Sequence, residues 1–324
     1  MKRNIFGITL IILVVLLVTS SSVLRAQTDA AAEKQKAVLV TGASTGIGRK
    51  ITEVLAANGH FVFAGARKQK DLDALDEIEN VKAVRLDVTV QEEIDAAVEL
   101  VRESGKGLYG LVNNAGVFIG GPLIEVDIDE LKWLLDVNVL GPYRVTQAFA
   151  PMIIEEKGRI TTIGSISGIL SRPFSGQYSM SKHAIEAYTD SLAGEMGRFD
   201  VKVSVVEPGN YHSEIGNSAM QRMRDKDYAQ EGSPYAEDLK LMMERPSDRS
   251  QFKEPDEVAE AVLHALFDAS PKRRYLVVPN QDEAGWTIGK AIEEMVQLNE
   301  GQPYSYSREQ LIEMLDGALA TNKE

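Results

Sequence analysis

The segment that most constrains the fold is a glycine-rich loop between an apolar run and an amphipathic run. AVLVTG covers residues 37–42, the loop TGASTGIG covers residues 41–48, and GRKITEVLAANG continues to residue 59. Glycines let the loop turn tightly and approach a ligand, and the helix start offers free N–H groups and a positive dipole end. The spacing Gly-x-x-x-Gly-x-Gly differs from the Rossmann pattern Gly-x-Gly-x-x-Gly, so the prediction depends on the strand before the loop and the helix after it. We predict a pyrophosphate site, with a simple tight turn as the alternative, and expect contacts from Gly42, Ser44, Thr45, Gly46, Ile47 and Gly48.

Short apolar runs alternate with longer amphipathic stretches along the rest of the chain. The runs lie at residues 37–42, 61–66, 83–88, 108–114, 159–164, 201–209 and 275–279, and they are apolar throughout rather than at every second position. Such runs are typical of parallel strands that are covered on both faces. Helical stretches between them, at residues 48–59, 91–105, 128–153 and 182–197, predict right-handed crossovers. We therefore predict an α/β fold, a Rossmann-like doubly wound parallel sheet in a single domain over residues 36–280.

Two later segments depart from this alternation of apolar runs and amphipathic stretches. Residues 211–252 are polar and carry Met220, Met223, Met242 and Met243, which fits either an ordinary helical insertion or a lobe that covers the substrate. Ligands of open α/β sheets bind beyond the carboxyl ends of the strands, which favours the covering lobe. Residues 281–324 predict a C-terminal helical extension.

The amino terminus is directed to a membrane. No charge lies between Arg3 and Arg25, and the intervening IFGITLIILVVLLV is strongly apolar. Residues 4–24 are long enough to span a bilayer as an uncleaved anchor, and the same pattern fits a signal peptide cleaved near Ala26. We predict membrane association through this segment, or export after cleavage, with the side of the membrane left open. Residues 1–35 are set apart from the fold on this ground.

Composition excludes several classes of function. The 35 basic and 48 acidic residues give a net charge of −13, which disfavours nucleic acid as a partner. The chain has no cysteine, which excludes disulfides and thiolate nucleophiles. Its four histidines lack metal-ligand spacing, so we predict no metal site.

The end of the second apolar run bears on the choice of dinucleotide. A carboxylate there would bind the adenosine ribose and repel a 2′-phosphate, whereas this chain has Ala66, Arg67 and Lys68. Arg67 therefore favours NADP(H) over NAD(H), and the alternative is that Arg67 and Lys68 are solvated loop charges.

Taken together, the motifs resemble those of the short-chain dehydrogenase/reductase family over residues 36–279. The matching stretches are TGASTGIG, LDVT at 86–89, NNAG at 113–116, DVNVLGPYRVTQ at 136–147, GSISG at 164–168, YSMSK at 178–182 and EPG at 207–209. The resemblance implies a catalytic tetrad of Asn138, Ser165, Tyr178 and Lys182. It also implies cofactor contacts by Asp87, Val88, Asn114, Ala115, Gly116, Pro208, Gly209 and Ser213, besides Tyr178 and Lys182. Relatives of this family pair through two long helices, which implies a homodimer or homotetramer through residues 128–156 and 177–197.

Tyr178 and Lys182 also make chemical sense together. Residues four apart lie on one face of a helix, so both side chains can point into one cleft. A free tyrosine titrates near ~10, and a neighbouring ammonium favours its phenolate. Tyr178 can then exchange a proton with an alcohol or carbonyl while hydride moves to or from a nicotinamide, and Ser165 can hold the reacting oxygen. By the resemblance, Lys182 binds the nicotinamide ribose and Asn138 positions a water in the proton relay.

We therefore predict an NADP(H)-dependent oxidoreductase that interconverts an alcohol and its carbonyl. The membrane segment and the methionines favour an apolar substrate. A dinucleotide-binding sensor or scaffold without catalysis is the alternative, although a sensor does not need Tyr178. A serine hydrolase is excluded because GSISG places its serines second and fourth rather than third.

Overall fold

The computed structural model describes residues 35–226, 232–244 and 251–321. The membrane-directed segment predicted at residues 4–24 lies outside these ranges. Within them, no helix combines the length and the apolar composition that crossing a bilayer requires.

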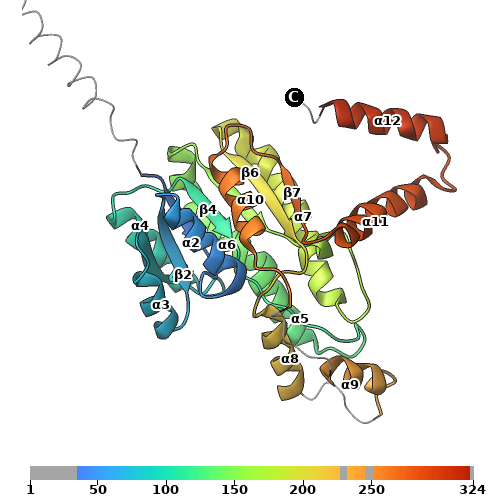
Figure 1. Cartoon of the computed structure of the whole chain (residues 1–324), viewed down its shortest axis with the longest axis horizontal. Coiled ribbons are helices and arrows are strands. Elements are labelled where there is room, and N and C mark those ends of the chain that lie inside the picture. Colours follow the sequence, from blue (N-terminus) through green and yellow to red (C-terminus); the bar gives the residue numbers. More distant parts are fainter. Residues whose placement is uncertain (1–34, 227–231, 245–250, 322–324) are drawn as a thin grey trace, which may run out of the picture. The chain divides into compact units, whose positions relative to one another are not determined.

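A seven-stranded parallel sheet forms the centre of the domain, in the order β3-β2-β1-β4-β5-β6-β7 (Figure 1). All seven predicted strands are present. Their bounds are β1 Ala37–Val40, β2 Phe61–Ala66, β3 Val81–Arg85, β4 Gly110–Asn113, β5 Arg159–Ile163, β6 Lys202–Pro208 and β7 Arg274–Val277. This is the predicted doubly wound Rossmann-like fold.

Eleven α-helices connect or follow the strands within the described ranges. They are α2 Gly46–Ala57, α3 Gln69–Asp76, α4 Gln91–Glu103, α5 Ile128–Leu135, α6 Gly141–Glu155, α7 Gly176–Met196, α8 Ile215–Asp225, α9 Ala236–Glu244, α10 Asp256–Phe267, α11 Gln281–Asn299 and α12 Arg308–Thr321. Three short helical segments add to them: the π-helix Asp136–Leu140 and the 3-10 helices Ile166–Gly168 and Gly197–Phe199.

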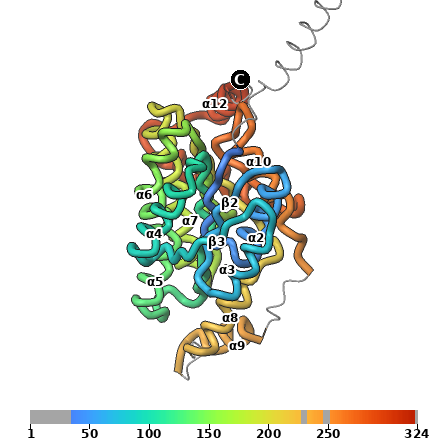
Figure 2. The backbone as a smooth tube through the Cα atoms, turned by 90° about the vertical axis from the view of Figure 1, so that its left-hand side faces the viewer, coloured from blue at the N-terminus to red at the C-terminus, as the bar shows by residue number. Residues whose placement is uncertain are grey.

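The sheet carries a hydrophobic core on each face because alternate residues of a strand point to opposite sides. Val38 and Val40 of β1 pack with side chains of α2, α3 and α10, whereas Ala37 and Leu39 pack with side chains of α4 and α6. Figure 2 shows the two helical layers on opposite sides of the strands. Strands buried on both faces explain why the apolar runs are continuous.

The strand order places the ligand site. After β3 the chain returns to the other side of β1 and forms β4 there, so the connections that leave β1 and β4 diverge. Ligands of open α/β sheets bind in the crevice at such a switch point, outside the carboxyl ends of the strands.

One predicted helix differs from the structure. Residues 128–153 were expected as a continuous helix, but the π-helical turn Asp136–Leu140 separates α5 from α6. Pro142 lacks an amide N–H, so it cannot complete the α-helical hydrogen bond to the carbonyl of Asn138. Gly141 also lies so close to Val88 that an added Cβ would sit 2.6 Å from that side chain. The wider turn accommodates both constraints and buries Asn138.

Candidate active site

One cavity of about 940 Å³ opens at the carboxyl ends of the strands. It is lined by Ser165, Tyr178 and Lys182 of the predicted tetrad. It is also lined by every predicted cofactor contact: Gly42, Ser44, Thr45, Gly46, Ile47, Gly48, Arg67, Asp87, Val88, Asn114, Ala115, Gly116, Pro208, Gly209 and Ser213. Asn138 does not line it.

The glycine loop closes against the segment that follows β4. Gly42 has φ +65, and a Cβ added there would lie 2.8 Å from the Cα of Ala115. Asn114 fixes the approach, because its Nδ2 donates to the carbonyls of Thr41 at 2.9 Å and Gly42 at 3.0 Å. The Thr41 hydroxyl accepts from the backbone N–H groups of Asn114 and Ala115, each at 3.0 Å. These contacts tie the loops after β1 and β4 together on the floor of the cavity.

Helix α2 begins at the edge of this floor. Its N-cap Thr45 makes no side-chain cap, and its first turn holds no acidic residue. Free N–H groups and a positive helix end therefore face a site walled by glycine backbone, which matches the needs of a pyrophosphate.

The ends of β2 and β3 bring cations and a carboxylate to one end of the cavity. Arg67 Nη1 lies 3.3 Å from Asp87 Oδ2, and its side chain is 58% exposed. Burial opposes the charge of Asp87, but hydrogen bonds from Thr89 and the Arg67 guanidinium hold the pKa of this carboxyl below its usual value. Lys68 and Lys70 line the same end. Arg67 is thus partly neutralised by Asp87, while two further cations lie beside it.

Lys182 is buried at the carboxyl end of β5. Its Nζ donates to the carbonyl of Ile163 at 2.8 Å, and only 6% of the residue is exposed. Burial lowers the pKa of Lys182 to about 8, and the negative charge of Glu186 opposes this shift. The ammonium lies 5.6 Å from the centroid of the Tyr178 ring. Lysine and tyrosine therefore meet on one face of α7, as their spacing predicts.

Ser165 and Phe118 line the same cavity as Tyr178. Ser165 caps the 3-10 turn after β5, where its Oγ accepts from the N–H of Ser167 at 3.1 Å. That contact leaves the hydroxyl proton of Ser165 available to a ligand in the cavity. The Phe118 ring lies 5.0 Å from the Tyr178 ring and packs against it.

Asn138 has a different position from the rest of the tetrad. Its Oδ1 accepts from the N–H of Val117 at 2.8 Å, and its Nδ2 donates to the carbonyl of Val117 at 2.9 Å and to Ser181 Oγ at 3.0 Å. The side chain thus joins the loop after β4 to α7, where its partner Ser181 is the residue before Lys182. Both N–H groups of the side-chain amide are therefore used within the protein.

The wall opposite the glycine loop was only partly predictable. It includes Phe118, Trp133, Leu170, Arg172 and Arg222, of which Phe118 and Leu170 each lie two residues beyond a recognised motif. Within residues 211–252, α8 supplies Ile215, Ser218, Ala219 and Arg222 to the cavity. The four methionines noted in that segment do not line it, and Met223 is buried. The cavity lining therefore gives the methionines no direct part in the proposed apolar substrate site, and sequence position did not show which face of each helix meets the cavity.

Helix α8 is held over the cavity by an ion pair to α5. Arg222 binds both carboxylate oxygens of Glu130, with Nη2 to Oε1 at 2.8 Å, and stacks on Trp133 at 3.9 Å. Glu130 is buried, and the hydrogen bond from Arg222 lowers its pKa. This pair fixes the lobe to the wall of the site.

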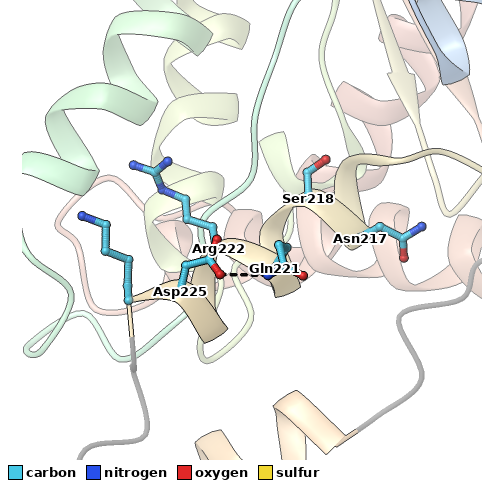
Figure 3. A pocket seen from close by; sticks show the side chains of 6 residues that line it. Asn217, Ser218, Gln221, Arg222 and Asp225 are labelled. Atoms are coloured by element: carbon cyan, nitrogen blue, oxygen red, sulfur yellow. Dashed lines mark hydrogen bonds between the residues drawn. The ribbon is translucent and has the colours of Figure 1, made fainter.

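A second depression, of about 580 Å³, runs along α8 (Figure 3). It is lined by Asn217, Ser218, Gln221, Arg222, Asp225 and Lys226, which belong to or directly follow this one helix. Gln221 and Asp225 bond to each other along the helix at 2.8 Å. The depression lacks groups converging from several elements, so we place the chemistry in the larger cavity.

Comparisons with known proteins agree with this geometry. A family model described as short chain dehydrogenase matches residues 36–224. The mitochondrial D-β-hydroxybutyrate dehydrogenase of Bos taurus is 36% identical over 265 residues, which cover 74% of this chain and 76% of that protein. Retinol dehydrogenase 16 of Rattus norvegicus is 33% identical over 266 residues, which cover 78% of this chain and 81% of that protein.

Solved structures show the same fold. A short chain dehydrogenase/reductase from Burkholderia phymatum in complex with NAD is 25% identical and has a TM-score of 0.69, covering 84% of this chain and 99% of that chain. An alcohol dehydrogenase from Thermococcus sibiricus complexed with 5-hydroxy-NADP is 25% identical with a TM-score of 0.61, covering 75% of this chain and 96% of that chain. These neighbours support a nicotinamide dinucleotide as the cofactor. From its matching family model, its relatives and its seven-stranded parallel sheet, the chain belongs to the short-chain dehydrogenase/reductase family of oxidoreductases.

Proposed function

We propose that the protein is an NADP(H)-dependent oxidoreductase that interconverts an alcohol and its carbonyl. The observation that carries the proposal is the convergence of Ser165, Tyr178 and Lys182 on the cavity that the glycine loop lines. A dinucleotide fits this cavity, because Gly42, Gly46 and Gly48 line it without side chains and the α2 start is uncapped. The loop and the α2 N–H groups would hold its pyrophosphate, and its nicotinamide supplies or accepts hydride.

The chain's own residues handle the proton. The Ser165 hydroxyl donates a hydrogen bond to the reacting oxygen and holds it beside Tyr178. In the reductive direction the Tyr178 hydroxyl gives its proton to that oxygen, and in the oxidative direction the phenolate takes it back. The Lys182 ammonium stabilises the phenolate, and two of its three N–H donors remain for the nicotinamide ribose and a water. Asn138 joins α7 to the loop after β4 and so helps to position Lys182.

The preference for NADP(H) rests on charge. Arg67 follows β2 directly, the first carboxylate after that strand is Asp71, and the cavity is lined by Lys68, Lys70 and Asp71 as well as by Arg67. A 2′-phosphate there would exchange the long 3.3 Å pairing of Arg67 with Asp87 for a charge-assisted hydrogen bond.

For the substrate we propose an apolar alcohol or carbonyl. Phe118, Trp133 and Leu170 form the wall near Tyr178, and a relative is named for retinol. One observation favours a second class, a hydroxy acid. Arg172 lines the cavity and stacks on Trp286 at 5.0 Å, but no carboxylate of the described residues pairs with it. A relative named for hydroxybutyrate fits this class.

Matched substrates separate the two classes. We would compare retinoid, steroid and long-chain carbonyls with short keto acids, and then repeat the panel with Arg172→Met. A loss of about one to two decades in kcat/KM for keto acids alone would support the hydroxy-acid class, since hydrogen bonds to charged groups contribute roughly 1.5–3 kcal/mol. An unchanged preference for apolar carbonyls would support the apolar class.

Tyr178→Phe tests the chemistry and separates an enzyme from a sensor. The variant lacks only the hydroxyl that moves the proton, so we expect turnover to fall by at least two decades while NADPH affinity stays within about twofold. Fluorescence titration and stopped-flow kinetics give the two values. Full activity in the variant would contradict the mechanism, and dinucleotide binding by the wild type without turnover of any carbonyl or alcohol would support the sensor.

We also propose that residues 1–35 associate the enzyme with a membrane and that residues 36–280 form the catalytic domain. Residues 211–252 act in this proposal as the lobe that covers the substrate, and residues 281–324 form a helical extension. Mass spectrometry of the native amino terminus, with protease protection in sealed membranes, tests the first point. A mature chain that begins near Gln27 and is recovered wholly in a soluble extract would contradict anchorage.

A further inference from the structure

Four charged side chains form a cluster behind the catalytic lysine. Arg274 of β7 donates through Nε to Glu207 at 2.7 Å, and through Nη2 to Glu186 at 2.8 Å and to Asp190 at 3.4 Å. Glu207 is 1% exposed and the Glu186 side chain is 13% exposed, so both carboxyl groups are shielded from water. A single arginine thus serves one buried and one half-buried carboxyl group, and neither is used by the proton transfer described above.

Glu186 reaches the backbone that carries the catalytic serine. It lies one helical turn beyond Lys182 on α7. A Cβ added at Gly164 would lie 2.9 Å from Glu186 Oε1, and one added at Gly168 would lie 2.8 Å from the same oxygen. The carboxylate therefore packs against the segment that begins next to Ile163, the hydrogen-bond acceptor of Lys182, and that also contains Ser165.

Glu186 lies close enough to Glu207 to favour a proton on Glu207. Burial, followed by the charge and the hydrogen bond of Glu186, raises the pKa of Glu207 to about 8. Glu186 Oε1 is buried and has no hydrogen-bond donor among the described groups unless Glu207 carries a proton. A proton on Glu207 satisfies that oxygen and leaves one negative charge, on Glu186, beside the arginine and near the lysine.

We propose that Glu186 is a positioning residue for the reaction: with Glu207 and Arg274 it forms a proton-sharing carboxyl pair that keeps the buried Lys182 ammonium charged and braces the Ser165 segment. The inference rests on the function proposed above and extends it to residues outside the tetrad. Desolvation favours a neutral lysine, which could neither stabilise a phenolate nor hold a ribose through a positive charge. Glu186 is the anion one turn away that opposes this loss. The other ionisable groups in contact with Lys182, Glu186 or Asp190 are Tyr178, Glu207, Arg273 and Arg274, and α7 also carries His183 and Tyr188.

The test is the pH dependence of Glu186→Gln in the purified full chain, with Asp190→Asn as the matched control. Asp190 also contacts Arg274, but it lies two helical turns beyond Lys182 and its side chain is 51% exposed. Removing the Glu186 charge should move the high-pH limb of kcat/KM for NADPH-dependent reduction to lower pH by on the order of one unit. The Asp190→Asn limb should superimpose on that of the wild type.

Cofactor affinity gives a readout without turnover. A shift of about one unit lowers the protonated fraction of Lys182 at pH 8 from about one half to about one tenth, so the NADPH Kd from fluorescence should rise about fivefold in Glu186→Gln. At pH 6 the two proteins should bind nearly equally, because Lys182 is protonated in both. A general structural defect would instead weaken binding at both pH values.

Each outcome discriminates. If Glu186→Gln is active and has the same high-pH limb of kcat/KM and the same NADPH Kd at pH 8 as the wild type, the inference is overturned and the proposed function stays intact. If the wild type shows no turnover, the proposed function itself fails. If Glu186→Gln does not fold, Glu207→Gln replaces it, since glutamine has the shape of a protonated glutamate. The high-pH limb of kcat/KM in Glu207→Gln should then also move to lower pH, by less than expected for Glu186→Gln, because the ionisation of Glu207 near pH 8 is lost. A high-pH limb that does not move would overturn the inference.

Discussion

Asn114 offers the sharpest test of how the cofactor floor is built. Its Nδ2 donates to two main-chain carbonyls of the glycine loop, at 2.9 Å and 3.0 Å, across the switch point between β1 and β4. Asn114→Ala removes both donors. Each half-buried hydrogen bond contributes about 0.5–1.5 kcal/mol, so we expect a loss of about 2 kcal/mol in the free energy of unfolding. In a domain of this size that loss lowers Tm by roughly 4 °C.

The isosteric variant Asn114→Asp should be less stable to unfolding than the alanine variant at pH 7. It preserves the shape but turns acceptor oxygens toward two carbonyl oxygens, which adds electrostatic repulsion to the lost bonds. As the pH falls through the pKa of the new carboxyl, the aspartate variant should become more stable than the alanine variant, because a protonated acid can donate to one of the carbonyls. Thermal unfolding between pH 4 and pH 8 measures both effects, and NADPH titration reports whether the loop still binds.

Asn58→Ala is the control for these variants, since Asn58 Nδ2 also donates to a main-chain carbonyl, at 2.8 Å, but on an exposed helix end. We expect it to change the free energy of unfolding by no more than about 0.5 kcal/mol. An aspartate variant of Asn114 that is as stable as the alanine variant at pH 7 would refute the view that this side chain acts as a double donor.

Four further predictions concern the cofactor, the proton, the lobe and assembly. Arg67→Asp should weaken NADPH by about one to two decades relative to NADH, because it exchanges a guanidinium for a charge that repels the 2′-phosphate; a wild type that prefers NADH in paired titrations would contradict the assignment. Since burial holds the pKa of Lys182 near 8, compared with 10.5 for a free lysine, kcat/KM should fall as the pH rises through 8. Over the same window the unfolded chain keeps the proton longer, so this residue's contribution to the free energy of unfolding should rise from pH 8 to pH 10.5 and should vanish in Lys182→Met; urea titrations across that range measure it. Arg222→Met should speed proteolytic cleavage of α8 and α9 several-fold, because Glu130 loses its bidentate partner, and unchanged cleavage would deny the ion pair a role in holding the lobe. A chain that begins at Glu33 should be a dimer or tetramer in light scattering, paired through α5–α6 and α7, and a monomer would count against that pairing.

The fold was predictable because its strands leave a strong trace in the sequence. Residues buried on both faces of a sheet must be apolar without alternation, and each strand is separated from the next by at least one helical stretch. The π-turn at Asp136–Leu140 left no such trace, because its cause is one missing N–H at Pro142 together with a close contact between Gly141 and Val88. Local periodicity does not report a contact between residues so far apart in the chain.

The site was predictable where a motif names a residue and less so where a residue only fills space. Glycine-loop and YSMSK residues occupy the cavity because their spacing determines their geometry. Phe118 could have been inferred as the continuation of NNAG, whereas Trp133 and Arg222 face the cavity through the packing of α5 and α8. The stripe Tyr178, Lys182 and Glu186 was visible at four-residue spacing, but its partner Arg274 was not. That arginine comes from the far edge of the sheet, where only the register of β6 and β7 brings it beside Glu207.

The position of Lys182 explains why one helix can serve both halves of the site. β1 to β4 provide the loops that fit a dinucleotide, while β5 and β6 lead to Ser165 and to the Pro208–Gly209 turn. Lys182 is anchored at the end of β5, between these halves, by the carbonyl of Ile163. In the proposed function this lysine must remain charged to act on both the ribose and the tyrosine, yet its burial favours the neutral form. In the proposed mechanism an acidic group near Lys182 helps to keep it charged, and Glu186 is the group that we propose for this role.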